Sequence, residues 1–223
     1  GCTVKRAPVQ PGTIPKLAAP TPAAEKYGNY LFQKVHSDYD DDSDSQQYDR
    51  LMAVFDHLTN AAEVDHLPWH VYLLEGPEIV DIRAVYGNYV FVWSGVFDSI
   101  ENDDELAGLL ACELSHTLAH HTDPVQFTLA SDVFFSVAEL ATSLGLMVAS
   151  QGAVVIAGQG WMKYAYVEIS DLDSLDREYS PEHEREAAGI ALLILSRTPY
   201  SARALLDFWK RAAVDDSQPD KFE

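Results

Sequence analysis

The hydrophobic positions of this chain recur with two different periods, and the change of period predicts a fold that combines helices with a small sheet. Between residues 46 and 63 the apolar side chains recur every three to four positions, which is the spacing of one helical face. That face consists of Leu51, Val54, Phe55 and Leu58. Asp44 or Ser45 stands directly before it and has the short polar side chain that caps a helix N-terminus.

The next apolar runs are short and rich in β-branched and aromatic residues, which favours strands. They cover residues 69–74, 79–85 and 88–93, and Gly76-Pro77 separates the first two runs. Gly87-Asn88 separates the last two, and this dipeptide favours a tight turn between paired strands. We therefore expect a small, largely antiparallel sheet.

Helical spacing returns after the sheet. Asp103 begins an acidic run that favours the positive end of a helix, and this helix should end before Asp123-Pro124. Its apolar face consists of Leu106, Leu109, Leu110, Leu114 and Leu118. A further helix should begin at Ser180-Pro181 and reach Leu195, and a last one should follow Thr198-Pro199. The pattern predicts the α+β class, mostly helical, with the sheet preceding the long helix.

The first residues have the composition of a tether. Residues 1–27 are rich in proline and alanine, which bury little surface and favour an extended chain. Gly1-Cys2 resembles the end of a bacterial lipobox, in which the cysteine becomes lipid-modified. Thr3 after the cysteine is typical of outer-membrane sorting. We expect lipid on Cys2 to anchor the protein to the membrane, on the periplasmic side of the outer membrane in the bacterial cell envelope.

The charge balance limits the possible partners. The chain has 35 acidic and 15 basic residues in 223, a net charge of -20, and no basic cluster long enough to grip phosphates. We expect no nucleic-acid partner. Residues 140–162 carry no charge, but glycines and glutamines interrupt them, so we favour buried helices or a partner surface over a membrane span.

The strongest chemical signal lies in the middle of the helix that starts at Asp103. Cys112-Glu113-Leu114-Ser115-His116 matches the H-E-x-x-H motif of zinc proteases, with cysteine at the first histidine. In that motif two side chains one helical turn apart hold zinc, and the glutamate deprotonates the metal-bound water. Cys112 and His116 are four residues apart and therefore share a helical face.

These elements resemble the HtpX-like zinc metallopeptidases, peptidase family forty-eight of the metallo class, and most of all their periplasmic lipoprotein or BepA-like members. The family's Tyr-Ile-Phe-Val-x-x-Gly-Leu pattern corresponds to residues 89–96. Its Glu-Leu-Ala-x-x-Leu-x-His-Glu-x-x-His helix corresponds to residues 105–116. The resemblance extends from about residue 46 to 212, and it implies a zincin-like metallopeptidase domain over residues 28–223.

The resemblance also assigns roles to single residues. Glu113 corresponds to the family's general base, and His116 corresponds to a zinc ligand. The family's third ligand is the first glutamate of Glu-x-Glu-Ala-Asp, which corresponds to Glu184. The aspartate of that motif, a supporting partner of the metal site, is replaced by Ala188. His121 matches a further histidine of the family, placed near the metal ligands.

Two departures therefore fall on one site, at Cys112 and at Ala188. Cysteine can bind zinc, but its side chain is shorter than that of histidine, and a thiolate weakens the metal's ability to acidify water. Loss of a supporting carboxylate costs about ten- to a hundredfold in metal affinity or activity. We expect zinc binding to be weak or absent, with Cys112 acting as a small buried hydrophobe. His120 is an alternative ligand, one turn beyond His116.

Two functions follow from this interpretation. The first is a membrane-anchored protein with an impaired or inactive peptidase site, which binds envelope proteins or peptides through the strand that ends at Gly95. The alternative is an active zinc metalloendopeptidase in envelope protein quality control, with Cys112 or His120 as the replacement ligand.

Overall fold

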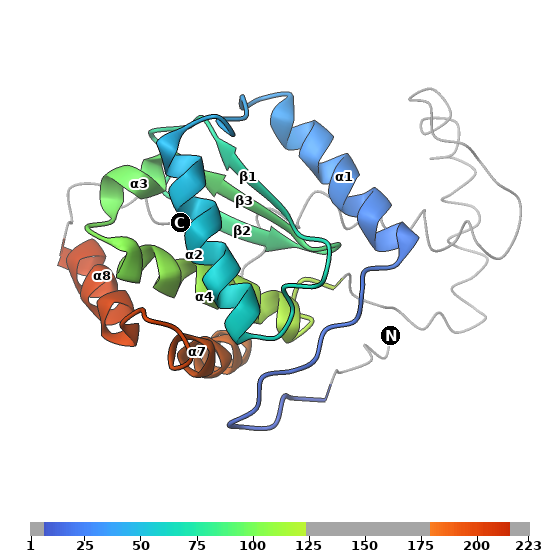
Figure 1. Cartoon of the computed structure of the whole chain (residues 1–223), viewed down its shortest axis with the longest axis vertical. Coiled ribbons are helices and arrows are strands. Elements are labelled where there is room, and N and C mark those ends of the chain that lie inside the picture. Colours follow the sequence, from blue (N-terminus) through green and yellow to red (C-terminus); the bar gives the residue numbers. More distant parts are fainter. Residues whose placement is uncertain (1–6, 124–178, 215–223) are drawn as a thin grey trace, which may run out of the picture. The chain divides into compact units, whose positions relative to one another are not determined.

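The computed structural model describes residues 7–123 and 179–214, which contain a three-stranded sheet and six helices that contact it or one another. The helices before the sheet are α1 (Pro22–His36) and α2 (Gln46–Ala61). The strands are β1 (His70–Leu74), β2 (Ile82–Val85) and β3 (Tyr89–Trp93). They are followed by α3 (Gly95–Ser99), α4 (Asp103–Leu118), α7 (Pro181–Leu195) and α8 (Ala202–Val214). Figure 1 shows the arrangement.

The sheet is mixed, with the order β1-β3-β2. β2 and β3 form the expected antiparallel hairpin, with Ala84 opposite Val90. Gly87 and Asn88 make its turn with φ of +99° and 66°, a backbone conformation that glycine and asparagine adopt most readily. β1 runs parallel to β3. β3 is therefore the central strand. The expectation that the strand ending at Gly95 offers an edge for peptides is wrong. In the described part of the chain, the sheet edge next to α4 belongs to β2.

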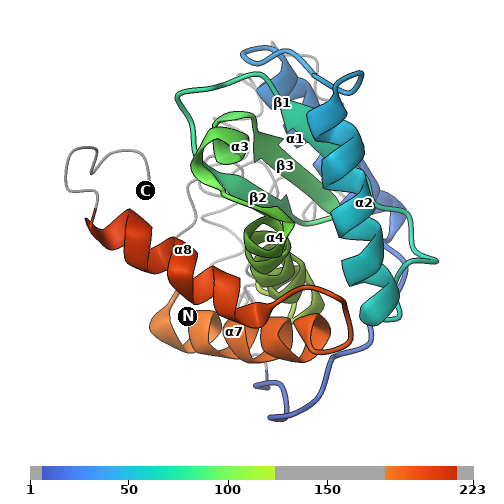
Figure 2. The ribbon, with the colours of Figure 1, turned by 60° about the vertical axis from the view of Figure 1, so that its left-hand side comes forward.

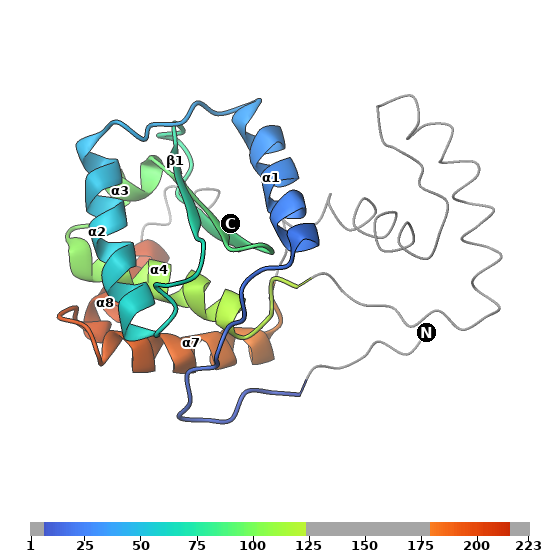
Figure 3. The same ribbon diagram turned by 45° about the vertical axis from the view of Figure 1, so that its right-hand side comes forward.

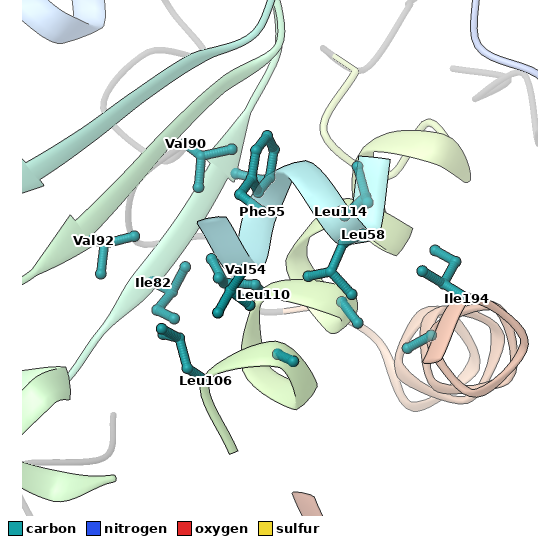
Figure 4. Close-up of a cluster of buried hydrophobic side chains, with 14 of the residues drawn as sticks. Val54, Phe55, Leu58, Ile82, Val90, Val92, Leu106, Leu110, Leu114 and Ile194 are labelled. Carbon is teal, nitrogen blue, oxygen red and sulfur yellow. The ribbon is translucent and has the colours of Figure 1, made fainter. Parts of the chain in front are cut away.

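Both faces of the sheet are covered, which explains why every residue of β3 is buried. Val90 and Val92 pack with side chains of α2 and α4 in the main core, as Figure 4 shows. On the opposite face α1 contacts aromatic residues of the sheet. Phe32 stacks on Tyr72 with ring centroids 4.1 Å apart. Side-chain alternation along β3 thus produces two apolar faces, each facing a helical layer.

The helix α4 is at the centre of the described structure. It contacts α2 and β2 on one side and α7 and α8 on the other, and Figure 2 shows it between the sheet and these last two helices. Four of the five leucines of the predicted face, Leu106, Leu110, Leu114 and Leu118, have no exposed surface, and Leu109 is partly exposed. Gly108 allows α8 to approach, because a Cβ atom there would lie 2.8 Å from the Cβ of Leu205.

The segment before α1 packs on the domain from residue 9 onward. Val9, Ile14 and Leu17 are partly buried against the main core, and the Val9 N–H donates a hydrogen bond to Glu186 of α7. Figure 3 shows the segment running from the α7 end of the domain to α1. α1 itself begins at Pro22, with Thr21 as its cap, within the stretch whose composition predicts a tether.

Candidate functional site

The second half of α4 carries the predicted catalytic positions, and two other elements enclose them. Asn102 caps the helix by accepting a hydrogen bond from the Glu105 N–H, which fixes where its turns begin. The leucine face then points into the core, so Cys112, Glu113 and His116 meet β2 and α7. Residues far apart in the sequence therefore form one site.

Glu113 is bound to the edge strand of the sheet. Its Oε2 accepts a hydrogen bond from the Ala84 N–H at 2.8 Å. Burial raises the pKa of this carboxyl to about 8, although the Ala84 N–H and the nearby Arg83 guanidinium act in the opposite direction. Glu113 is therefore a partly buried acid that holds its proton close to neutral pH.

The pairing of β2 explains why the Ala84 N–H points at Glu113. The Trp93 N–H donates to the Asp81 carbonyl at 3.1 Å, so alternate residues of β2 direct their backbone groups away from β3. These outward residues are Ile82 and Ala84. The Ile82 N–H donates to Asp81 Oδ1 at 2.8 Å, as the Ala84 N–H does to Glu113. Carboxylates thus accept both outward donors of the edge strand.

Cys112 is a half-buried free thiol. Burial, and then the charges of Glu113 and Glu184, raise its pKa to about 12. Without a metal the sulfur is therefore protonated at neutral pH and is a poor nucleophile, and zinc binding would have to displace this proton. This agrees with Cys112 as a small apolar side chain.

His116 and Glu184 do come together. His116 Nε2 lies 3.7 Å from Glu184 Oε2, with His116 2% exposed and the Glu184 side chain 58% exposed. Burial, with smaller contributions from neighbouring charges, lowers the pKa of His116 to about 3, so the imidazole is neutral and the contact is no ion pair. Tyr179 stacks on the His116 ring with centroids 3.7 Å apart.

A second histidine lies directly behind the first. His121 Nδ1 is 3.1 Å from His116 Nδ1, and His121 Nε2 is 2.7 Å from Glu186 Oε2. The His121 side chain is fully buried, and its ring stacks on His183 with centroids 4.2 Å apart. The sequence placed His121 near the site, and the structure adds Glu186 as its carboxylate partner.

The helix α7 delivers both glutamates. Ser180 caps it by accepting a hydrogen bond from the His183 N–H, and Pro181 occupies its first turn, as the sequence predicted. Glu184 reaches His116, and Glu186 reaches His121. Ala188, which replaces the family's aspartate, is exposed on this helix.

His120 lies outside the helical face that its spacing suggested. α4 ends at Leu118, and His120 has a φ of 57° in the turn that follows. Its ring is 44% exposed, and Nδ1 lies 3.1 Å from Asp123 Oδ2. The helical turn that would align His120 with His116 is not formed.

The residues that sequence reasoning missed are Asp81, Arg83, Ala84, Tyr179 and Glu186. Arg83 Nε donates to Asp81 Oδ2 at 2.8 Å. Burial raises the pKa values of Glu113 and Glu184, and the Arg83 guanidinium opposes this rise. The same guanidinium adds a small contribution to the lowering of the His116 pKa, which burial dominates. The two-residue spacing of Asp81 and Arg83 in a strand was an available signal, because it places both side chains on one side. Nothing in the sequence indicated which α4 residue would lie beside them.

The zinc that the resemblance implies requires three or four donors at about 2.0–2.3 Å. The separation of His116 Nε2 and Glu184 Oε2 suits two ligands of one ion. Among the residues that the structure describes, however, no three His, Cys, Asp or Glu side chains are arranged to hold a metal. Cys112 would have to lose its proton to serve as a third donor. The described residues alone therefore do not complete the family's zinc site, and we derive no chemical step through zinc.

Two predicted features lie outside the described residues: the lipid-modified Cys2 and the uncharged stretch 140–162. Within residues 7–123 and 179–214, every helix is too short or too polar to cross a bilayer.

The known proteins that this chain resembles are named as metalloendopeptidases or proteases. The metalloendopeptidase OMA1 of Bos taurus mitochondria is 23% identical over 182 residues, which cover 77% of this chain and 32% of the relative. The mitochondrial metalloendopeptidase OMA1 of Saccharomyces cerevisiae is 27% identical over 159 residues, or 71% of this chain and 41% of the relative. A Vibrio cholerae protein, named for the beta-barrel assembly-enhancing proteases, is 26% identical over 136 residues, which cover 60% of this chain and 26% of the relative.

The chain thus spans less than half the length of each of these relatives. A family model described as Peptidase family M48 matches residues 45–223, a region that includes β2, α4 and α7. Since this match covers most of the chain and all three elements that form the site, the chain belongs to peptidase family M48.

Proposed function

We propose that this chain is a family M48 protein that has lost peptidase catalysis and retains peptide binding, as a component of a cell-envelope assembly. The observation that carries the proposal is the state of the motif on α4. Cysteine occupies the first ligand position, and the Glu113 carboxyl is hydrogen-bonded to the sheet at Ala84. A general base must reach the proton that it removes, and one of the two carboxyl oxygens of Glu113 is already engaged by the backbone of β2.

The edge strand β2 is the proposed binding surface. The outward N–H groups of Ile82 and Ala84 are the donors that an added strand would use, and both already bond carboxylates. A bound peptide would exchange Glu113 Oε2 for one of its own carbonyl oxygens at Ala84. The side chain that served as catalytic base then becomes a group that a peptide displaces.

The cellular location is part of the same proposal. Lipid on Cys2 would hold the protein at the periplasmic side of the outer membrane, with envelope proteins or peptides as partners and 140–162 as a second partner surface. The Vibrio cholerae relative, whose name refers to beta-barrel assembly, is the comparison that supports a role in an envelope assembly.

An active zinc metalloendopeptidase is the alternative. The observation in its favour is that His116 and Glu184, which correspond to two of the family's three ligands, lie 3.7 Å apart. It requires a third donor from outside the described residues or a rearranged Cys112.

Binding at β2 can be tested with Ala84→Pro. Proline has no N–H, and the Ala84 N–H points away from β3, so the variant removes a binding donor without breaking the sheet ladder. A labelled casein peptide should bind the wild type and remain intact. Its affinity for the variant should fall about two- to tenfold, given ~0.5–1.5 kcal/mol for each lost hydrogen bond.

Trp209→Ala is the matched control, because this exposed aromatic residue on α8 lies outside the site. Weaker binding by this variant would show that the peptide adheres non-specifically to exposed apolar side chains. The control should bind as the wild type does. Equal binding by Ala84→Pro, with an unchanged circular dichroism spectrum, would reject β2 as the binding edge.

A further inference from the structure

The segment before α1 has a defined conformation, although its composition predicts a tether. The Thr13 N–H donates to the Gln10 carbonyl at 3.2 Å, which closes a turn over Pro11 and Gly12. Gly12 has a φ of +79°, so the turn has proline at its second position and glycine at positive φ at its third, as in a type II turn. Thr13 Oγ1 donates a further hydrogen bond to the same carbonyl at 2.6 Å. The local sequence therefore specifies the shape of this segment.

The segment is attached to the domain at both of its ends. At the N-terminal end, the Val9 N–H donates a hydrogen bond to Glu186 of α7. At the C-terminal end, Thr21 caps α1, and α1 lies so close to the hairpin that a Cβ atom on Gly87 would overlap its backbone. Residues 8–20 thus span the distance from α7 to α1, as Figure 3 shows.

The two attachments differ in how much surface they bury. Val9, Ile14 and Leu17 are only partly buried against the main core, and Lys16 and Ala18 are exposed between and beside them. The helix α1, in contrast, has five buried residues: Ala24, Tyr27, Gly28, Leu31 and Val35. Segments with few buried side chains open at a lower free-energy cost than well-buried elements. The Val9 end therefore separates from the domain before α1 does.

The α7 end of this span lies next to the candidate site. Residues 182–185 are exposed, and the buried face of α7 begins only after Glu186. Glu186 accepts the Val9 N–H and lies 2.7 Å from His121 Nε2, so it joins the first turns of the helix to two other segments. Glu184 lies two residues before it on the same exposed turn. The position of Glu184 therefore depends on how firmly the turn that carries Glu186 is held.

We infer that residues 8–20 form a strap that closes on the start of α7 and holds Glu184 in its place at the site. With the strap docked, the first turns of α7 are connected to α1 on the other side of the sheet. With the Val9 end released, the strap stays attached through α1, and the start of α7 loses a contact and becomes more mobile. The strap acts on Glu184 whether or not the chain cleaves peptides.

Gly12→Val tests the strap without removing a packing contact. A Cβ atom on Gly12 would have no other atom within 4 Å, but a β-branched residue is strongly disfavoured at positive φ. The variant should therefore destabilise the turn and release the Val9 end. Trypsin cleavage of the full chain after Lys16, identified by mass spectrometry, should become about tenfold faster, because cleavage follows the population of the open segment.

Hydrogen exchange measures the consequence for the site helix. The backbone amides of residues 184–188 should exchange about tenfold faster in Gly12→Val than in the wild type, and those of residues 106–114 in α4 should be unchanged. Ala18→Val is the matched control, because it adds the same side chain at an exposed strap position that has no positive φ. It should behave as the wild type does in both measurements.

A second variant covers the case in which the turn accommodates Gly12→Val. Ile14→Ser removes an apolar contact between the strap and the core, so it should increase both rates in the same direction. Unchanged cleavage after Lys16 in both variants would overturn the docking of the strap. Faster cleavage with unchanged exchange at residues 184–188 would overturn its control of α7. Neither measurement involves a bound peptide, so these failures are distinct from a failure of the proposed function.

Discussion

Glu105, which is buried, and Glu113, which is partly buried, are two carboxyl groups on one helix, and their surroundings differ in kind. Glu105, 2% exposed, is bonded by two guanidinium nitrogens of Arg211 at 2.6 Å and by the Glu101 N–H at 2.8 Å. These hydrogen bonds, those from Arg211 above all, lower its pKa. Glu113 accepts a hydrogen bond from one backbone N–H, and burial raises its pKa to about 8.

The difference separates a structural acid from a functional one. Arg211 neutralises Glu105 and attaches α8 to the start of α4. Glu113 has a contact that a ligand can exchange, and its raised pKa is typical of a carboxyl kept for chemistry. Cys112 precedes this carboxyl at the position where the family motif has histidine.

Loss of the Arg211 guanidinium should have the largest effect on stability. Arg211→Ala leaves the Glu105 carboxylate buried without its counter-charge, and removing one partner of a buried pair costs about 3–5 kcal/mol. Because the Arg211 side chain is 38% exposed, we expect a loss on the order of 3 kcal/mol in the free energy of unfolding, measured by urea denaturation.

The neighbouring Lys210 provides the control. Its amine is exposed and pairs weakly with Asp207, so Lys210→Ala should change stability by less than about 0.5 kcal/mol. Adding Glu105→Gln to Arg211→Ala should restore part of the loss, because the buried charge is then absent. If Arg211→Ala is as mild as Lys210→Ala, Glu105 is not the structural acid described above.

The second effect is smaller and depends on pH. A carboxyl with a raised folded pKa binds its proton more tightly in the native state, so the native state loses stability as the pH rises from 4.5 toward about 8. Glu113→Gln keeps an oxygen for the Ala84 N–H and removes this titration. Relative to the wild type, we expect the variant to gain on the order of 2 kcal/mol at pH 9 and almost nothing at pH 4.5.

Thermal unfolding of the chelator-treated protein across this pH range measures the effect. Glu182→Gln, an exposed site on α7, should run parallel to the wild type at every pH. A constant difference between Glu113→Gln and the wild type would mean that the carboxyl does not titrate between pH 4.5 and 8.

The helices and the hairpin were predictable because local rules decide them. The leucine spacing of α4, the caps at Ser45 and Ser180, and the Gly87-Asn88 turn act over a few residues. The central position of β3 was not predictable, because the pairing of β1 depends on packing between distant segments.

The same distinction applies to the site. The motif residues Glu113, His116 and Glu184 could be selected by resemblance, and the structure brings the last two within 3.7 Å. The Glu186–His121 contact connects positions 65 residues apart and needs the tertiary structure. The end of α4 at Leu118, followed by the positive φ of His120, depends on the turn that joins α4 to the next segment.

The central claim is that this family M48 chain no longer cleaves peptides, and one comparison tests it most directly. Cleavage of labelled casein is measured with the wild type and with Glu113→Gln, each supplied with equimolar zinc. We predict the same background rate for both proteins. Cleavage by the wild type that disappears in Glu113→Gln would contradict the claim and establish a working peptidase.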